Sequence, residues 1–107
     1  SMTSPYYIVF ILYLLLSPLL SQSINGFIRE EATGEPVSYA NVFLSDTDLG
    51  AATNRDGYFV ITDVPNGDYE FNVTMIGYGV YKEQISVSDT VPLRLEIRLK
   101  EEVIETS

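Results

Sequence analysis

Two oxygen-rich stretches are the parts of this sequence whose residue types could hold a metal ion. Asp46 and Asp48 lie in one stretch, and Asn54 and Asp56 lie in the other. A calcium ion takes about 6–8 oxygen ligands, often from carboxylates. However, Asn, Asp and Gly are also the residues that close tight turns between strands, and no calcium-binding loop that ends in Glu is present. The turn interpretation is therefore favoured over a calcium site, and we expect no bound metal.

The chain lacks two of the side-chain types that enzymes use most often. It contains no histidine and no cysteine among its 107 residues. The usual general base and the usual transition-metal ligand are therefore missing. With 15 acidic and 6 basic residues, the net charge is −9, and a surface of this sign repels nucleic acid and anionic membranes. The composition argues against an enzyme, a cofactor and a nucleic-acid partner, and it predicts no catalytic residue.

Two motifs in the second half of the chain have structural interpretations. In the stretch PNGDY, Tyr69 follows Gly67 at a position from which a hydroxyl can bond to a nearby backbone group at the corner of a sandwich. A half-buried aromatic residue on a strand is the alternative. The stretch NVT at Asn72 matches an N-glycosylation acceptor. Because it lies in the middle of an expected strand, an outward-facing polar residue is the better interpretation.

An uncharged apolar run extends from Tyr6 to Leu20. It is shorter than the roughly 20 residues that a membrane-spanning helix needs. Its length and the small residues behind it are typical of a secretory signal peptide, with cleavage after Ser21 or after Ser23. We predict that residues 1–21 are a signal peptide, of which Ser1 is a cloning remnant. An uncleaved membrane anchor and an apolar strand of the domain are the alternatives.

From residue 24 on, apolar and polar residues alternate in short segments that turns separate. An alternation of period two places one face of a strand in the core and the other in water. We expect about seven short strands that form an all-β, antiparallel sandwich, with turns at Gly34 and Gly57. The apolar faces predict a core made of Ile28, Val42, Leu44, Phe59, Ile61, Phe71, Val73, Leu95 and Ile97.

The order of these strands and turns resembles a known family. After Gly26 in the first expected strand come the motifs TGEPV, YANVFL, LGAATNRDGYF, VPNGDYEF and a closing IGY. Taken in this order, residues 24–100 are similar to the carboxypeptidase-regulatory-like domain. The resemblance implies a seven-stranded sandwich of the transthyretin type with Greek-key connections, which would occupy residues 22–100.

Domains of this family stand behind the signal peptide in many TonB-dependent outer-membrane receptors. The resemblance therefore implies an exported, non-catalytic module on the periplasmic face of the outer membrane that acts in nutrient uptake. Its partner would be a TonB-type energy-transducing protein or another periplasmic protein. Residues 101–107 are similar to a TonB box, in which Val103 and Ile104 would contact the partner by adding a strand to its sheet. The plug and the membrane barrel would come after Ser107.

A second class of protein fits the same residues. A stand-alone secreted or surface sandwich could bind carbohydrate or serve as an accessory domain. The two hypotheses differ in the coding sequence beyond Ser107: a plug and barrel there favour the receptor, and a stop codon favours the small secreted protein.

Overall fold

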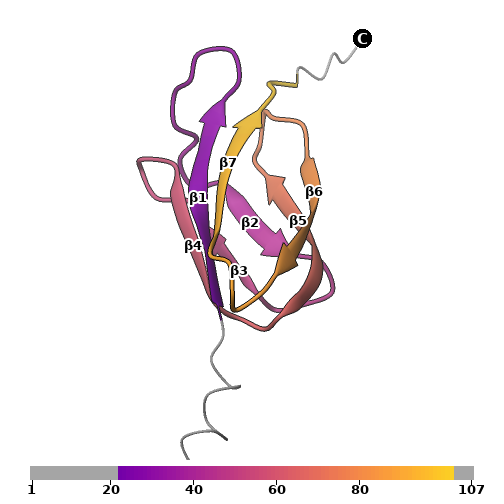
Figure 1. Cartoon of the computed structure of the whole chain (residues 1–107). Coiled ribbons are helices and arrows are strands. Elements are labelled where there is room, and N and C mark those ends of the chain that lie inside the picture. Colours follow the sequence, from indigo (N-terminus) through magenta and orange to yellow (C-terminus); the bar gives the residue numbers. More distant parts are fainter. Residues whose placement is uncertain (1–21, 103–107) are drawn as a thin grey trace, which may run out of the picture.

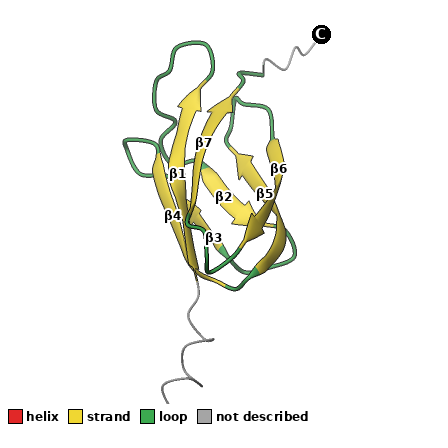
Figure 2. Ribbon diagram, in the orientation of Figure 1, coloured by secondary structure: helices red, strands yellow, loops and turns green. Residues whose placement is uncertain are grey.

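The computed structural model describes residues 22–102, which form seven strands in two sheets (Figure 1). The predicted signal peptide, 1–21, and residues 103–107 lie outside the described residues. Figure 2 shows only strands and loops in the described part, which contains no helix long and apolar enough to cross a membrane. The strands are β1 (Gln22–Glu30), β2 (Asn41–Leu44), β3 (Gly50–Ala52), β4 (Tyr58–Val64), β5 (Gly67–Thr74), β6 (Tyr81–Val87) and β7 (Leu93–Leu99).

The strands form a sandwich of the predicted kind. One sheet has the order β4-β1-β7 and the other has the order β3-β2-β5-β6. Neighbouring strands pair antiparallel, except that β1 and β7 run in parallel. The seven-stranded β-sandwich is confirmed, and the parallel pair is a departure from a purely antiparallel arrangement. Two parallel neighbouring strands need a long connection, and here the chain from β2 to β6 forms the connection between β1 and β7.

The core lies between the sheets and is built from alternate strand positions. All of the predicted core residues except Leu95 are buried. Leu95 is only half-buried: Leu93 and Leu95 in the first part of β7 are partly exposed, whereas Ile97 and Leu99 further along the same strand are buried. Phe59 on β4 and Phe71 on β5 connect the two sheets, with ring centroids 5.6 Å apart. The core also contains Ile24, Val37, Ala40, Val64, Ile85, Val87 and Leu99.

A β-bulge interrupts the alternation of β4. Ile61 faces the core, but the next buried residue is Val64 rather than Asp63. The register between β1 and β4 shifts at this point, and Asp63 has a φ of 59°. A bulge inserts one extra residue into a strand. Asp63 therefore stays at the surface, and Val64 returns to the core.

Gly26 in β1 lies directly against the backbone of β7. A Cβ atom at this position would be 1.9 Å from the carbonyl oxygen of Leu95. The two strands can approach in this way only if residue 26 has no side chain. Gly34 and Gly57 have a different role, since their φ values of 77° and 78° lie in the left-handed region that glycine adopts without strain.

Asn72 alternates with the core residues Phe71 and Val73, as an outward-facing residue should, but it is not exposed to solvent. The residue is only 2% exposed. Its side-chain amide donates hydrogen bonds to Ser45 Oγ at 2.8 Å and to the Glu70 carbonyl at 3.1 Å. The nitrogen that glycosylation would modify is therefore buried and bonded inside the folded domain. Strand alternation identifies the face on which a residue lies, but not whether neighbouring side chains cover it.

Candidate partner-binding surface

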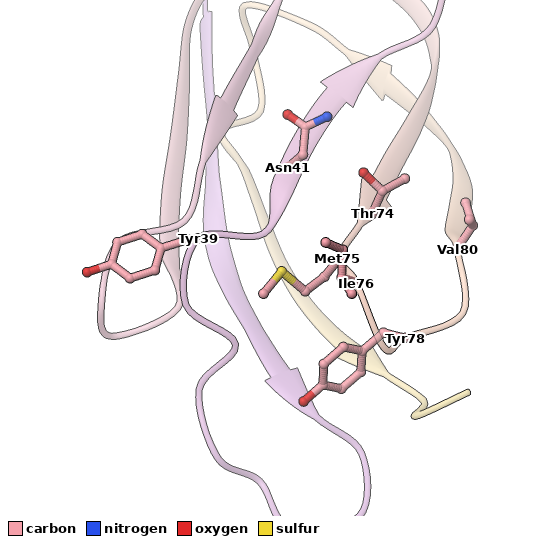
Figure 3. Close-up of a pocket in the computed structure, with 7 residues that line it drawn as sticks. All are labelled: Tyr39, Asn41, Thr74, Met75, Ile76, Tyr78 and Val80. Atoms are coloured by element: carbon pink, nitrogen blue, oxygen red, sulfur yellow. The ribbon is translucent and has the colours of Figure 1, made fainter. Parts of the chain in front are cut away.

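Exposed apolar side chains gather at one end of the four-stranded sheet. Tyr39 is 66% exposed, Ile76 is 96% exposed and Val80 is 60% exposed. Together with the half-buried Met75 and Tyr78, they surround an open hollow of about 450 Å³. We call these five residues the apolar shelf. Figure 3 shows that Tyr39 comes from the loop before β2, whereas the other four come from the loop between β5 and β6.

The backbone of Tyr39 is held in a strained conformation. Its φ is 62°, a left-handed value that is uncommon for a bulky residue. Thr53, which is buried, holds this loop in place through hydrogen bonds. Thr53 Oγ1 donates to the Val37 carbonyl and accepts from the Ala40 amide, both at 2.8 Å, and the Tyr39 amide donates to the Thr53 carbonyl at 3.0 Å. The loop thus keeps an aromatic ring in solvent at the expense of backbone strain.

A tight turn presents the most exposed member of the shelf. The Tyr78 amide donates to the Met75 carbonyl at 3.1 Å, and Gly77 adopts a φ of 91°. Residue types with a side chain rarely adopt this value, so Gly77 allows the turn to form. Ile76 occupies the turn itself, where no neighbouring strand can cover its side chain.

The C-terminal segment of the described chain is bound beside the shelf. The Gly79 amide donates to the Lys100 carbonyl at 2.9 Å, and the Glu102 amide donates to the Gly77 carbonyl at 3.0 Å. Tyr78 and Glu101 form an antiparallel bridge between these two bonds. We call this arrangement the C-terminal clasp. It brings the point where the chain leaves the described domain next to Ile76.

Tyr78 also ties the clasp to β1. Its hydroxyl donates a hydrogen bond to a carboxylate oxygen of Glu30 at 2.8 Å. This bond raises the pKa of Tyr78 above its usual value of 10.0, because ionised tyrosine can no longer donate it. Partial burial and the negative charges of Glu30 and Glu101 raise the pKa further.

The residues considered as calcium ligands do not form one site. Asp46 and Asp48 lie in the turn between β2 and β3, whereas Asn54 and Asp56 lie beyond the opposite end of β3. Asn54 Oδ1 accepts hydrogen bonds from the amides of Asp56 and Tyr58, at 2.9 and 3.0 Å. Within residues 22–102, no group of three or more His, Cys, Asp or Glu side chains could hold a metal ion.

Tyr69 and Gly67 lie at the turn that begins β5. The Tyr69 hydroxyl donates a hydrogen bond to the Pro65 carbonyl at 2.6 Å. This contact crosses the turn and fixes the ring against it, as in the corner arrangement of other sandwiches. A Cβ atom at Gly67 would make only an ordinary van der Waals contact with the ring, at 3.6 Å, so the glycine is needed for its φ of 156° rather than for space.

The expected partner contacts at Val103 and Ile104 lie outside the described residues. The apolar shelf itself was not predicted from the sequence. A signal for part of it exists in the stretch MIGYGV, where apolar residues and glycines stand together without strand alternation. For Tyr39 there is no such signal, because its conformation depends on the distant Thr53.

The family is identified by a match that extends over nearly the whole domain. The sequence profile described as "CarboxypepD_reg-like domain" matches residues 24–107. The chain belongs to this family. None of the curated proteins matches the chain in sequence.

Solved structures with the same fold come from several kinds of protein. A type II cohesin–X-dockerin complex of Acetivibrio cellulolyticus shares 20% identity, with a TM-score of 0.60 over 75% of this chain and 58% of that chain. The minor pilin GBS52 of Streptococcus agalactiae shares 15% identity, with a TM-score of 0.57 over 81% and 47%. A DUF3823 family protein of Bacteroides ovatus shares 15% identity, with a TM-score of 0.55 over 77% and 45%. This protein thus spans less than two thirds of the length of each of these three solved chains.

Proposed function

We propose that this domain is the non-catalytic, N-terminal periplasmic module of a TonB-dependent outer-membrane receptor. In this role it binds a TonB-type protein, or another periplasmic protein, during nutrient uptake. Membership of the family supports a β-sandwich module. The resemblance of residues 101–107 to a TonB box supports the choice of partner.

The observation that carries the proposal is the position of the apolar shelf. Ile76 and Val80 expose their side chains close to Glu102, the last residue of the C-terminal clasp. Contiguous exposed apolar side chains mark interaction sites in soluble domains. A partner that binds the residues after Glu102 would meet the shelf at the same time.

Residues 103–107, the C-terminal tail, supply the other part of the proposed partner contact. An extended segment can join a partner's sheet as an additional strand, which pairs its free backbone groups. Fixing each residue costs roughly 1–2 kcal/mol of backbone entropy. We therefore expect a weak and transient complex, to which the preformed shelf adds apolar contact without this cost.

The proposal is tested by NMR titration of the full chain with the C-terminal domain of a TonB protein. We expect the signals of Val103 and Ile104 to shift first, followed by those of Ile76 and Val80. Before titration, amide exchange in residues 103–107 should be fast, as expected for a tether. Strong protection of that segment in the free protein would instead favour a simple extension of β7.

A matched pair of variants separates the shelf from general apolar exposure. Val80→Asp places a charge on the shelf and should weaken the complex. Val91→Asp makes the same change at a residue with nearly equal exposure, 62% against 60%, in the loop between β6 and β7. The Val91 variant should bind like the parent protein. Equal loss in both variants, or an absence of shifts in both tail and shelf, contradicts the proposal.

The rival function is a stand-alone secreted or surface sandwich that binds carbohydrate. The reading frame beyond Ser107 distinguishes the two hypotheses. A plug and barrel in that frame support the receptor, and a stop codon directly after Ser107 overturns it.

A further inference from the structure

The outer face of the three-stranded sheet is positively charged, although the protein as a whole is strongly acidic. Figure 2 shows β4, β1 and β7 side by side in this sheet. Three of the six basic residues lie on its outer face: Arg29 on β1, and Arg94 and Arg98 on β7. Glu96 is the carboxylate beside them on β7. Half of the positive charge of a chain with net charge −9 is therefore on one sheet face.

Two of these arginines are arranged around an aromatic centre. Phe27 packs against Tyr58 with ring centroids 5.2 Å apart. The guanidinium carbon of Arg29 is 5.3 Å from the Phe27 ring centroid, and that of Arg94 is 5.9 Å away. Such cation–π contacts hold a guanidinium in place through its flat face. Its N–H groups remain at the edge, where they can bind a planar anion.

The guanidinium N–H groups are not occupied by the neighbouring carboxylate of Glu96. In the described part of the chain, Glu96 forms no ion pair with Arg29, Arg94 or Arg98, and the ion pair between Lys82 and Glu70 lies on the other sheet. Arg29 donates one hydrogen bond, to the Gly34 carbonyl at 3.4 Å. Two arginine side chains are thus preorganised and have donors left for a ligand.

We propose that this face binds an extended acidic segment of a partner protein. Carboxylates form paired hydrogen bonds with guanidinium groups. In an extended peptide, side chains on one face repeat at about 7 Å, so carboxylates on alternate residues can reach the two guanidiniums that flank a single ring. Arg98 is the register partner of Arg29 on the adjacent strand. It extends the site so that a third carboxylate can bind. This site is separate from the apolar shelf and does not depend on the proposed receptor function.

The net charge of the whole chain makes the site selective. At long range a charge of −9 repels an acidic ligand. At contact distance the local arginines dominate, because screening by salt acts over about 8–10 Å. Only a segment that docks on this face gains attraction, and we expect weak binding elsewhere on the surface.

Binding is tested with the full chain and a short fluorescein-labelled peptide in which Glu alternates with Thr. Fluorescence anisotropy should show saturable binding that a peptide with Gln in place of Glu lacks. Arg29→Gln and Arg94→Gln should each weaken binding about tenfold or more, since each removes a charged hydrogen-bond donor. Arg94→Lys keeps the charge but loses the paired geometry, and it should give an intermediate loss.

Arg55→Gln is the matched control, because it changes the net charge by the same amount at an exposed turn outside the strands of this sheet. It should alter the affinity less than about twofold. In NMR spectra, the peptide should shift the ring signals of Phe27 and Tyr58. The proposal is overturned if Arg55→Gln weakens binding as much as Arg94→Gln, if the shifts concentrate on Tyr39 and Ile76, or if polygalacturonate binds while the peptide does not.

Discussion

Tyr39 combines two unfavourable properties in a single residue. It has left-handed backbone dihedrals, and its ring is mostly exposed to water. Strain of this kind typically costs about 1–3 kcal/mol and persists where the surroundings enforce it. Thr53 is the residue that enforces it here, through bonds to both sides of the loop. A residue that serves only stability would not be expected at this position.

Replacing this tyrosine should separate stability from binding. Glycine adopts the same backbone conformation without strain, and little burial is lost with a ring that is 66% exposed. We expect Tyr39→Gly to raise the free energy of unfolding by about 0.5–1 kcal/mol, after allowance for glycine's greater entropy in the unfolded state. The same variant should bind the periplasmic partner more weakly. Urea denaturation and the NMR titration measure the two effects.

Tyr39→Ala is the control for this prediction. Alanine removes the ring but retains a Cβ atom, so the backbone strain remains. It should reduce binding without the gain in stability. Equal stability of the Gly and Ala variants would show that the loop is not strained.

The two sheets are held together mainly by apolar side chains that cross between them. Phe71 on β5 and Phe59 on β4 are fully or almost fully buried and in contact. Truncation of a buried Phe removes its transfer free energy and leaves a cavity. We expect Phe71→Ala to cost about 3–5 kcal/mol of stability. Phe43→Ala, on the outer face of the same sheet where the ring is half-buried, should cost clearly less in the same denaturation experiment.

The C-terminal clasp should weaken at alkaline pH. The pKa of Tyr78 is raised in the folded protein by its bond to Glu30, so its contribution is complete below the unfolded value of 10.0 and is lost as the pH rises through the folded value. The melting temperature of the parent protein should therefore exceed that of Tyr78→Phe at pH 8, and the difference should shrink above pH 10. Thermal melts across this range measure it.

Tyr81 provides the comparison for the clasp. Its pKa is also raised, first by burial and then by the nearby Glu83. It lies on β6 and does not bond to Glu30. Tyr81→Phe should leave the Tyr78 contribution and its loss above pH 10 intact. If both variants remove the alkaline loss, the Glu30 bond is not its source.

Strand alternation predicts which elements exist and which faces they bury, but not how the elements meet. The predicted core is correct apart from Leu95, because burial in a sandwich follows from period two. Alternation places Leu95 on the same face of β7 as Ile97 and Leu99, but it does not predict how completely each position along that face is covered. The bulge at Asp63 and the burial of Asn72 depend on partners in neighbouring strands. The shelf was missed for the same reason, since Thr53 and Tyr39 meet only in the folded domain.

At the scale of the whole molecule, the charges are unevenly distributed. The chain has a net charge of −9, yet the outer face of one sheet carries three arginines beside a single glutamate on β7. The apolar shelf lies at one end of the other sheet. The domain thus offers two chemically different surfaces, one apolar and one cationic, on a single β-sandwich.

The parallel pairing of β1 with β7 decides how the domain responds to tension. β1 begins at one end of the sandwich and β7 ends at the other (Figure 1), and the two strands are paired from Ile24 with Leu93 to Glu30 with Leu99. A pull applied at Gln22 and Glu102 loads all bonds of this ladder together in shear, so that no single bond can fail first. A pull at Gln22 and Pro65 would instead open the antiparallel β1–β4 ladder from one end, because Gln22 pairs with Val64. In force spectroscopy the first attachment should withstand a clearly higher force, and the domain would then pass tension along the chain without unfolding.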